Sequence, residues 1–199
     1  MARVPVDERR RQLIDAAISL LTREGVGAAS TRRISEEAGV PLGLVHYCFS
    51  SKRELIGETI RFLNTENVDA ARTAIQVGSG GRDVGDALRA GFRAYWLTVE
   101  LAPERQLLTF ELNAYALRDP DLATVAAEWD RDLLAAVRDL LDGVAADAGV
   151  RWRAPVAEVA RLTLSVISGM TLSWLNDRDS AAARAVAELY VGQLSALVS

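Results

Sequence analysis

Cysteine, histidine and long apolar runs are scarce in this 199-residue sequence, and each shortage excludes a class of protein. The single cysteine, Cys48, has no partner for an intrachain disulfide, and one cysteine with one histidine is too few for a structural zinc site. The longest uncharged run, Leu162–Asn176, has 15 residues, fewer than the ~20 needed to cross a bilayer. We therefore expect a cytoplasmic protein with no membrane segment.

The residues that enzymes and secreted proteins need are also missing. Met1–Gln12 is rich in arginine, but no apolar stretch with a cleavage site follows it, so no signal peptide is expected. His46 and Cys48 are two residues apart on a predicted short helix and point to different faces, which prevents a nucleophile and base pair. No glycine-rich phosphate loop or cluster of metal ligands is seen. We expect no catalytic residue, no metal and no cofactor.

What the sequence does contain is apolar residues at helical spacing. Half of the residues are apolar, enough for a substantial core, and no segment alternates as a strand would. The pattern predicts an all-α protein of about nine helices. The predicted spans are Asp7–Glu24, Ser30–Ala38, Leu42–Cys48, a helix opening within Ser50–Glu54 and ending near Val77, Asp83–Leu101, Pro103–Arg118, Pro120–Asp147, Pro155–Asn176 and Ala181–Val198.

Helix ends carry recognisable signals. Gly25 is expected to end the first helix, and Ser30 to cap the second. Ser51 and Glu54 have the spacing of a capping box, in which each side chain bonds the other residue's backbone N–H. Gly78–Gly81 is the one glycine-rich stretch, and we interpret it as a loop.

The stretch Ser30–Val45 is the most informative part of the sequence. A capped two-turn helix, a turn containing glycine and a second short helix form the pattern of a DNA-binding helix-turn-helix. Its apolar residues are spaced to pack against the first helix, which leaves the other side chains facing outward. These apolar residues are Ile34, Ala38, Val40, Val45 and Phe49. Ordinary helical hairpins share parts of this pattern.

The segment Arg11–Leu55, RQLIDAAISLLTREGVGAASTRRISEEAGVPLGLVHYCFSSKREL, resembles the N-terminal domain of the TetR family of repressors. It matches the family pattern at Ala16, Ala17, Gly25, Ile34, Ala38, Gly39, Val40, Gly43, Phe49, Ser51, Lys52 and Leu55. It departs from that pattern at Ser35, Pro41 and His46, where alanine, serine and tyrosine are usual. About a quarter of the chain carries the resemblance. It implies a three-helix DNA-binding domain over 1–53 and a larger helical domain for ligand binding and dimerisation over 54–199.

Charge is distributed unevenly between these two parts. Residues 1–53 hold nine basic and six acidic side chains, a net charge of +3, whereas the remainder has a net charge of −7. A basic segment beside an acidic one is typical of a nucleic-acid-binding module joined to another module. Chance clustering of charges on a solvated surface is the alternative interpretation.

Nine residues are predicted to contact double-stranded DNA. Arg32 and Arg33 lie in a first helical turn, where the helix dipole disfavours cations, and Lys52 opens a helix whose free N–H groups favour a phosphate. Leu42, Gly43 and Leu44 begin the predicted recognition helix. The resemblance implies phosphate contacts by Thr31, His46 and Tyr47, and a base contact by Arg32. The full set is Thr31, Arg32, Arg33, Leu42, Gly43, Leu44, His46, Tyr47 and Lys52.

Simpler interpretations stay open for several of these residues. The two arginines can be solvated surface residues, and Leu42 and Leu44 can be buried against a neighbouring helix. His46 can be an ordinary packed or surface residue. Arg9, Arg10 and Arg11 either add nonspecific attraction to DNA or form a solvated arm.

The acidic remainder contains the candidates for a small-molecule site. These are Phe92, Tyr95, Trp96, Phe110, Glu111, Asn113, Trp129, Met170 and Trp174. Aromatic residues on amphipathic helices line ligand sites, but they also form ordinary cores. The last two predicted helices carry residues suited to a homodimer interface, among them Ser168, Gly169, Leu172, Ala183, Val186, Leu189 and Tyr190.

Together these features predict a ligand-responsive DNA-binding transcription regulator. The resemblance implies a dimeric repressor that an unidentified small-molecule inducer releases from a palindromic operator. An alternative keeps the DNA-binding segment but makes the larger domain bind a protein partner. An enzyme is the least supported interpretation.

Overall fold

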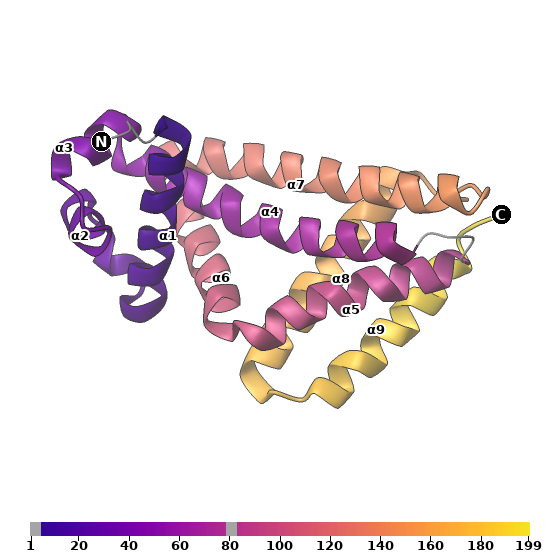
Figure 1. Cartoon of the computed structure of the whole chain (residues 1–199). Helices are drawn as coiled ribbons and strands as arrows, with labels where there is room; N and C mark the ends of the chain where they lie inside the picture. The colour runs from indigo at the N-terminus through magenta and orange to yellow at the C-terminus, as the bar shows by residue number, and fades with distance from the viewer. Residues whose placement is uncertain (1–4, 79–82) are drawn as a thin grey trace. The chain divides into compact units, whose positions relative to one another are not determined.

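The computed structural model describes residues 5–78 and 83–199, and over these residues the chain forms nine α-helices and one 3₁₀ turn (Figure 1). The predicted all-α class is confirmed. The elements are α1 (Val6–Glu24), η1 (Val26–Ala28), α2 (Thr31–Glu37), α3 (Leu42–Cys48), α4 (Lys52–Gly78), α5 (Val84–Leu101), α6 (Pro103–Arg118), α7 (Pro120–Asp147), α8 (Val156–Asp177) and α9 (Ser180–Ser195).

Most predicted helix ends agree with the structure to within a residue or two, but the end of α9 does not. The prediction carried this helix to Val198, whereas it ends at Ser195. The last residues instead pair with the segment before α8: Arg153 N–H donates to the Leu197 carbonyl at 2.7 Å, and Arg151 and Ser199 exchange two backbone hydrogen bonds. Of the predicted glycine-rich loop, residues 79–81 lie outside the described residues.

By contact, the chain divides into two compact units. Unit 1 comprises residues 1–64 and 104–129, and unit 2 comprises residues 65–103 and 130–199. The long helices α4 and α7 each contribute residues to both units. This division describes packing; the boundary between functional domains after residue 53 stays a prediction.

Unit 1 is organised around the apolar face of α1. Leu13, Ala17, Leu20 and Leu21 form one apolar stripe along this helix, and each is buried, at 2% exposure or less. The helix-turn-helix packs on this stripe as predicted. Ile34, Val45 and Phe49 are buried there, and Ala38 and Val40 are partly buried.

Unit 2 places α9 beside both α5 and α8 (Figure 1). Its core has two parts. The larger part gathers aliphatic residues such as Leu88, Leu141 and Val191. The smaller part, which we call the aromatic cluster, consists of Tyr95, Trp96, Val99, Met170, Trp174 and Ala183.

The helix α8 is long and apolar enough to cross a membrane by length and composition alone. The sequence did not predict a helix of this kind, because the uncharged run inside it has only 15 residues. Only 28% of its most apolar 18-residue stretch is buried. Two of its large apolar side chains, Leu162 and Leu172, are exposed in a single chain, at 46% and 48%.

Candidate nucleic-acid interface and ligand residues

The start of α2 is fixed by a side-chain cap. Ser30 has an extended backbone, and its Oγ accepts a hydrogen bond from the Arg33 backbone N–H at 3.2 Å, as predicted for an N-cap. The helix ends in a turn at Gly39, whose φ of 65° is in the left-handed region that favours glycine. Val40 N–H closes this turn on the Ser35 carbonyl at 3.0 Å. These bonds set the direction in which α3 begins.

The helix α3 has one buried face and one exposed face. Val45 and Cys48 point into the core of unit 1. Gly43, His46 and Tyr47 are exposed, Tyr47 at 60%. The exposed face thus presents the hydrogen-bonding side chains of His46 and Tyr47.

The two leucines of α3 have different surroundings. Leu42 is 39% exposed, at the start of the helix. Leu44 is partly buried and packs against the unit 1 core. Leu44 therefore also serves the packing role that the sequence left open, whereas much of Leu42 is available to a partner.

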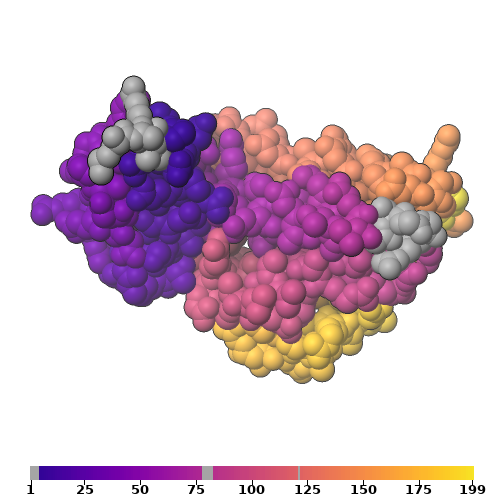
Figure 2. Space-filling model, viewed as in Figure 1, coloured from indigo at the N-terminus to yellow at the C-terminus, as the bar shows by residue number. Residues whose placement is uncertain are grey.

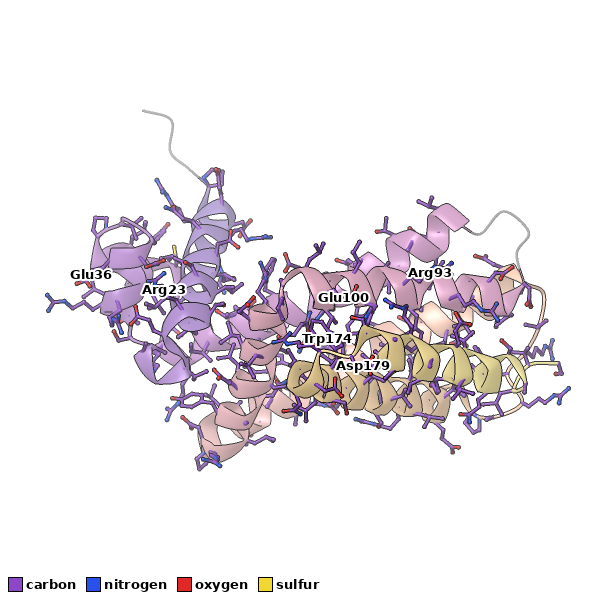
Figure 3. The ribbon with its side chains drawn as sticks, turned by 90° about the horizontal axis from the view of Figure 1, so that it is seen from below. Arg23, Glu36, Arg93, Glu100, Trp174 and Asp179 are labelled. Carbon is purple, nitrogen blue, oxygen red and sulfur yellow. The ribbon has the colours of Figure 1, made fainter. Side chains whose placement is uncertain are left out.

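Arg32 and Arg33 also differ. Arg32 is 81% exposed at its side chain, and among the residues that the structure describes it pairs only with Glu36 of its own helix, at 3.1 Å; Glu36 lies on the outer side of α2 (Figure 3). Arg33 is bound to Glu24 of α1, and this hydrogen bond lowers the pKa of the Glu24 carboxyl. Arg32 is thus the freer of the two to reach a ligand.

The start of α4 has half of the predicted capping box. Glu54 N–H donates to Ser51 Oγ at 3.1 Å, as expected. The prediction that the Glu54 side chain accepts from the Ser51 backbone N–H is wrong. The Glu54 carboxylate instead accepts from the backbone N–H and the hydroxyl of Ser50, both at 2.7 Å. The hydroxyl bond from Ser50 is the largest cause that lowers the pKa of Glu54.

Lys52 and Arg53 stand at this helix start, where the free N–H groups of α4 also lie. Lys52 is half-buried, and its Nζ lies 5.8 Å from the centroid of the Tyr115 ring. Arg53 Nε is 3.4 Å from Asp119 Oδ2. These residues line a pocket of about 330 Å³ with Ser51, Ile56 and Leu122. Two cations, Lys52 and Arg53, therefore line this pocket.

Arg10 has a role that the sequence did not reveal. Its guanidinium donates to the Cys48 carbonyl and to Glu54 Oε1 at 2.9 Å, and it lies 4.3 Å over the Phe49 ring. It joins α1 to the end of α3 and the start of α4. The interpretation of Arg10 as part of a solvated arm is therefore wrong.

A second cross-link joins α1 to the end of α2. Arg23 donates to Glu37 through both terminal nitrogens, at 3.1 and 2.9 Å, and Ser19 Oγ donates at 2.7 Å. The hydrogen bonds from Arg23 and then Ser19 lower the pKa of Glu37 to about 2, and the same pairing raises the pKa of Arg23. This pairing makes the attachment of α2 to α1 pH-dependent.

The variant Glu37→Gln should therefore lose stability relative to the parent only where Glu37 is ionised. Because the pKa is lowered by folding, the contribution is present above about pH 5 and is lost as pH falls towards 2. Urea unfolding from pH 6 to 2 should show the two curves converging as the solution becomes acidic. Glu36→Gln is the control, since the ion pair that Glu36 makes, with Arg32, lies within α2. A difference that grew in acid would contradict this assignment.

The predicted ligand residues fall into both units. Tyr95, Trp96, Met170 and Trp174 come together in the aromatic cluster of unit 2, and Phe92 packs against it, as Figure 3 shows in part around Trp174. Tyr95 shares a 2.6 Å hydrogen bond with Thr171, and burial raises the pKa of Tyr95 to about 12. The cluster is apolar with a few buried polar atoms.

The other four predicted ligand residues belong to unit 1. Glu111 is exposed, and Phe110 and Asn113 are partly buried. Trp129 is 4% exposed and packs on Gly57, where a Cβ atom would approach its ring to 2.7 Å. The structure therefore does not bring these four residues into the aromatic cluster. Trp129 has the packing role of a core residue.

The comparisons with known proteins bear on this arrangement. Residues 13–59 match the family described as bacterial regulatory proteins, tetR family. The HTH-type nicotine-responsive transcriptional repressor HdnoR of Paenarthrobacter nicotinovorans is 31% identical over 179 residues, which cover 88% of each chain. The chain belongs to the TetR family. This TetR-family protein is thus a helix-turn-helix transcription regulator, as the resemblance implied.

Two further relatives cover nearly the whole of this TetR-family protein. The HTH-type transcriptional activator FasR of Mycolicibacterium smegmatis is 33% identical over 188 residues, 90% of this chain and 80% of FasR. The crystal structure of the multidrug binding protein EbrR complexed with imidazole superposes with a TM-score of 0.67 and 27% identity, covering 94% of each chain. The similarity therefore extends beyond the DNA-binding segment.

Proposed function

We propose that this TetR-family protein is a dimeric repressor that a small molecule releases from a palindromic operator. The observation that carries the proposal is the exposed face of α3, whose opposite face packs in the core of unit 1. Arg32 is exposed on α2 at one end of the helix-turn-helix, and Lys52 opens the helix that follows it. The acidic side chains Glu24, Glu37 and Glu54 of the same unit are already paired with arginines.

The proposed contacts divide into those that hold the phosphate backbone and those that read bases. Lys52 and the first N–H groups of α4 fit a phosphate. Tyr47 and His46 can also donate to the phosphate backbone of the DNA. Leu42 and Gly43 suit contact with thymine methyl groups and close backbone approach. Arg32 is the side chain with the reach and exposure for a base edge.

The proposed dimer uses the exposed residues of α8 and α9. Leu172, Val186 and Leu189 are 48%, 44% and 71% exposed, and Ser168 and Gly169 are exposed beside them. Figure 2 shows the atoms of α9, in yellow, as a continuous strip of the molecular surface. Two of the predicted interface residues, Ala183 and Tyr190, are buried within the single chain instead. A four-helix interface of two α8–α9 pairs would cover this apolar surface.

Repression and release by a small molecule are supported by relatives. HdnoR is named as a nicotine-responsive repressor, and EbrR was crystallised with imidazole. FasR is named as an activator, so the sign of regulation is the part of the proposal that most needs a test. The aromatic cluster of unit 2 is the proposed place for the ligand. A cytoplasmic location, without a membrane, follows from the proposed work on DNA.

A gel-shift assay with a palindromic fragment from the neighbouring promoter tests the proposal. The parent should bind, with affinity that falls steeply as salt is raised, because phosphate contacts release counterions. The double variant Lys52→Ala with Arg32→Ala should bind at least about 100-fold more weakly, since each dimer loses two phosphate contacts and two base contacts. The control pair Arg138→Ala with Arg151→Ala removes the same charge from unit 2. If the first pair bound as well as the parent, the assigned surface would be wrong.

A further inference from the structure

The aromatic cluster contains one buried donor that has no acceptor. Trp96 is 7% exposed, and its indole Nε1 makes no hydrogen bond with any of the residues that the structure describes. Buried polar groups in native proteins are nearly always paired, so each exception calls for an explanation. Trp96 is central to the cluster, and its ring meets that of Trp174 edge to face at 5.8 Å.

The polar side chains near Trp96 are paired, so the unpaired state of its indole N–H is specific to this residue. The Trp174 indole N–H donates to Ser180 Oγ at 3.0 Å, and Ser180 Oγ donates to Glu100. Tyr95 shares its hydroxyl bond with Thr171. Figure 3 shows Glu100 and Trp174 near Asp179, at the turn that leads into α9. The fold thus satisfies a second buried indole close by and leaves that of Trp96 available.

The chemistry of the cluster defines what can pair with this N–H. An indole nitrogen only donates, so the missing partner must be an acceptor. The residues of the cluster are uncharged at neutral pH, and the carboxylate of Glu100 already accepts from Ser180 and lies 3.9 Å from Arg184. Charged side chains do lie beside the cluster, because the Arg178 guanidinium is 4.5 Å over the Trp174 ring, so the cluster selects a ligand by its acceptor atom and apolar surface rather than by its charge. Met170 has an unbranched and adaptable side chain and is the member of the cluster most able to move aside for a ligand.

We propose that the regulatory ligand is a mainly apolar ring compound whose acceptor atom takes the hydrogen bond of Trp96 Nε1–H. The inference rests on the proposed ligand-responsive function and names the chemical class of the ligand. The rings of Trp96 and Trp174 provide the aromatic contact with the ligand. The Trp96 N–H favours ligands that carry an acceptor atom. A hydrocarbon of the same shape would leave the N–H unpaired and bind more weakly.

Quinoline and naphthalene test this directly, because they share size and shape and differ by one ring nitrogen. The chain has four tryptophans, so the ¹⁵N-labelled full-length protein should give four indole N–H signals, with that of Trp96 assigned from Trp96→Phe. Quinoline should move the Trp96 indole proton downfield, as a new hydrogen bond does, and should bind roughly tenfold more tightly than naphthalene. Trp96→Phe should abolish this preference. Trp174→Phe removes a paired indole and should keep it.

Two results of this NMR experiment would overturn the inference. One is a Trp96 proton that already resonates at the downfield position of a bonded indole in the free protein. The other is an equal response of Trp96 to quinoline and naphthalene. A compound that releases the operator without moving the Trp96 signal would leave the proposed function standing and remove only this inference. Absence of operator binding in the gel shift would remove the proposed function, whatever the Trp96 signal does.

Discussion

Leu189→Glu should separate the dimer into monomers and weaken operator affinity by roughly 10²–10⁴-fold, because one subunit can then hold only one half-site. Leu189 is 71% exposed on α9, so the change removes little from the core of the single chain. In an α8–α9 interface the new carboxylate would be buried against apolar residues of both subunits without a counter-ion. Light scattering would give the mass, and fluorescence anisotropy the affinity for the operator.

Leu101→Glu is the matched control for this variant. Leu101 is 75% exposed at the end of α5 and lies outside the proposed interface. It should remain dimeric and bind the operator as the parent does. A Leu189→Glu protein that stays dimeric with full affinity would show that the dimer is formed by another surface.

Phe49→Ala should lower the free energy of unfolding by about 3–5 kcal/mol, the cost of removing a fully buried aromatic ring. Phe49 is 2% exposed in the unit 1 core, directly after α3. The Arg10 guanidinium rests on its ring, so the cavity would also loosen the link between α1 and the end of α3. Urea unfolding followed by circular dichroism would measure the loss.

Leu42→Ala provides the comparison for Phe49→Ala within the same motif. Because Leu42 is 39% exposed, its truncation should cost about 1 kcal/mol or less. It should instead weaken DNA binding, which Phe49→Ala affects only through folding. Equal losses of stability in the two variants would contradict the assignment of Phe49 as a core residue and Leu42 as a surface residue.

Local signals explain why much of unit 1 could be predicted from the sequence. Ser30 caps α2 and Gly39 makes the turn because each acts on backbone groups within a few residues of itself. The apolar spacing in α1 likewise fixes which face is buried, and the structure buries that face. The exposed side of α3 follows from the same periodicity. These features need no knowledge of distant residues.

The features that sequence reasoning missed depend on contacts between distant residues. Arg10 bonds Glu54 across 44 positions, and Arg33 is bound by Glu24 of another helix. Helical spacing shows which face is apolar but not which helix it meets. For that reason the aromatic candidates were predicted as one ligand set, although Trp129 packs in unit 1 and Trp96 in unit 2. The unpaired indole of Trp96 could be found only once its neighbours were known.

The most direct test of the DNA-binding surface uses the fact that Lys52 is the only lysine of the chain. Acetylation of the full-length protein, followed by mass spectrometry, reports on two amines, Lys52 and the N-terminus. A palindromic operator should slow acetylation of Lys52 at least about tenfold, in line with a charge-assisted phosphate contact, and a scrambled duplex should protect Lys52 less. Equal acetylation of Lys52 with and without the operator would show that Lys52 does not contact the DNA.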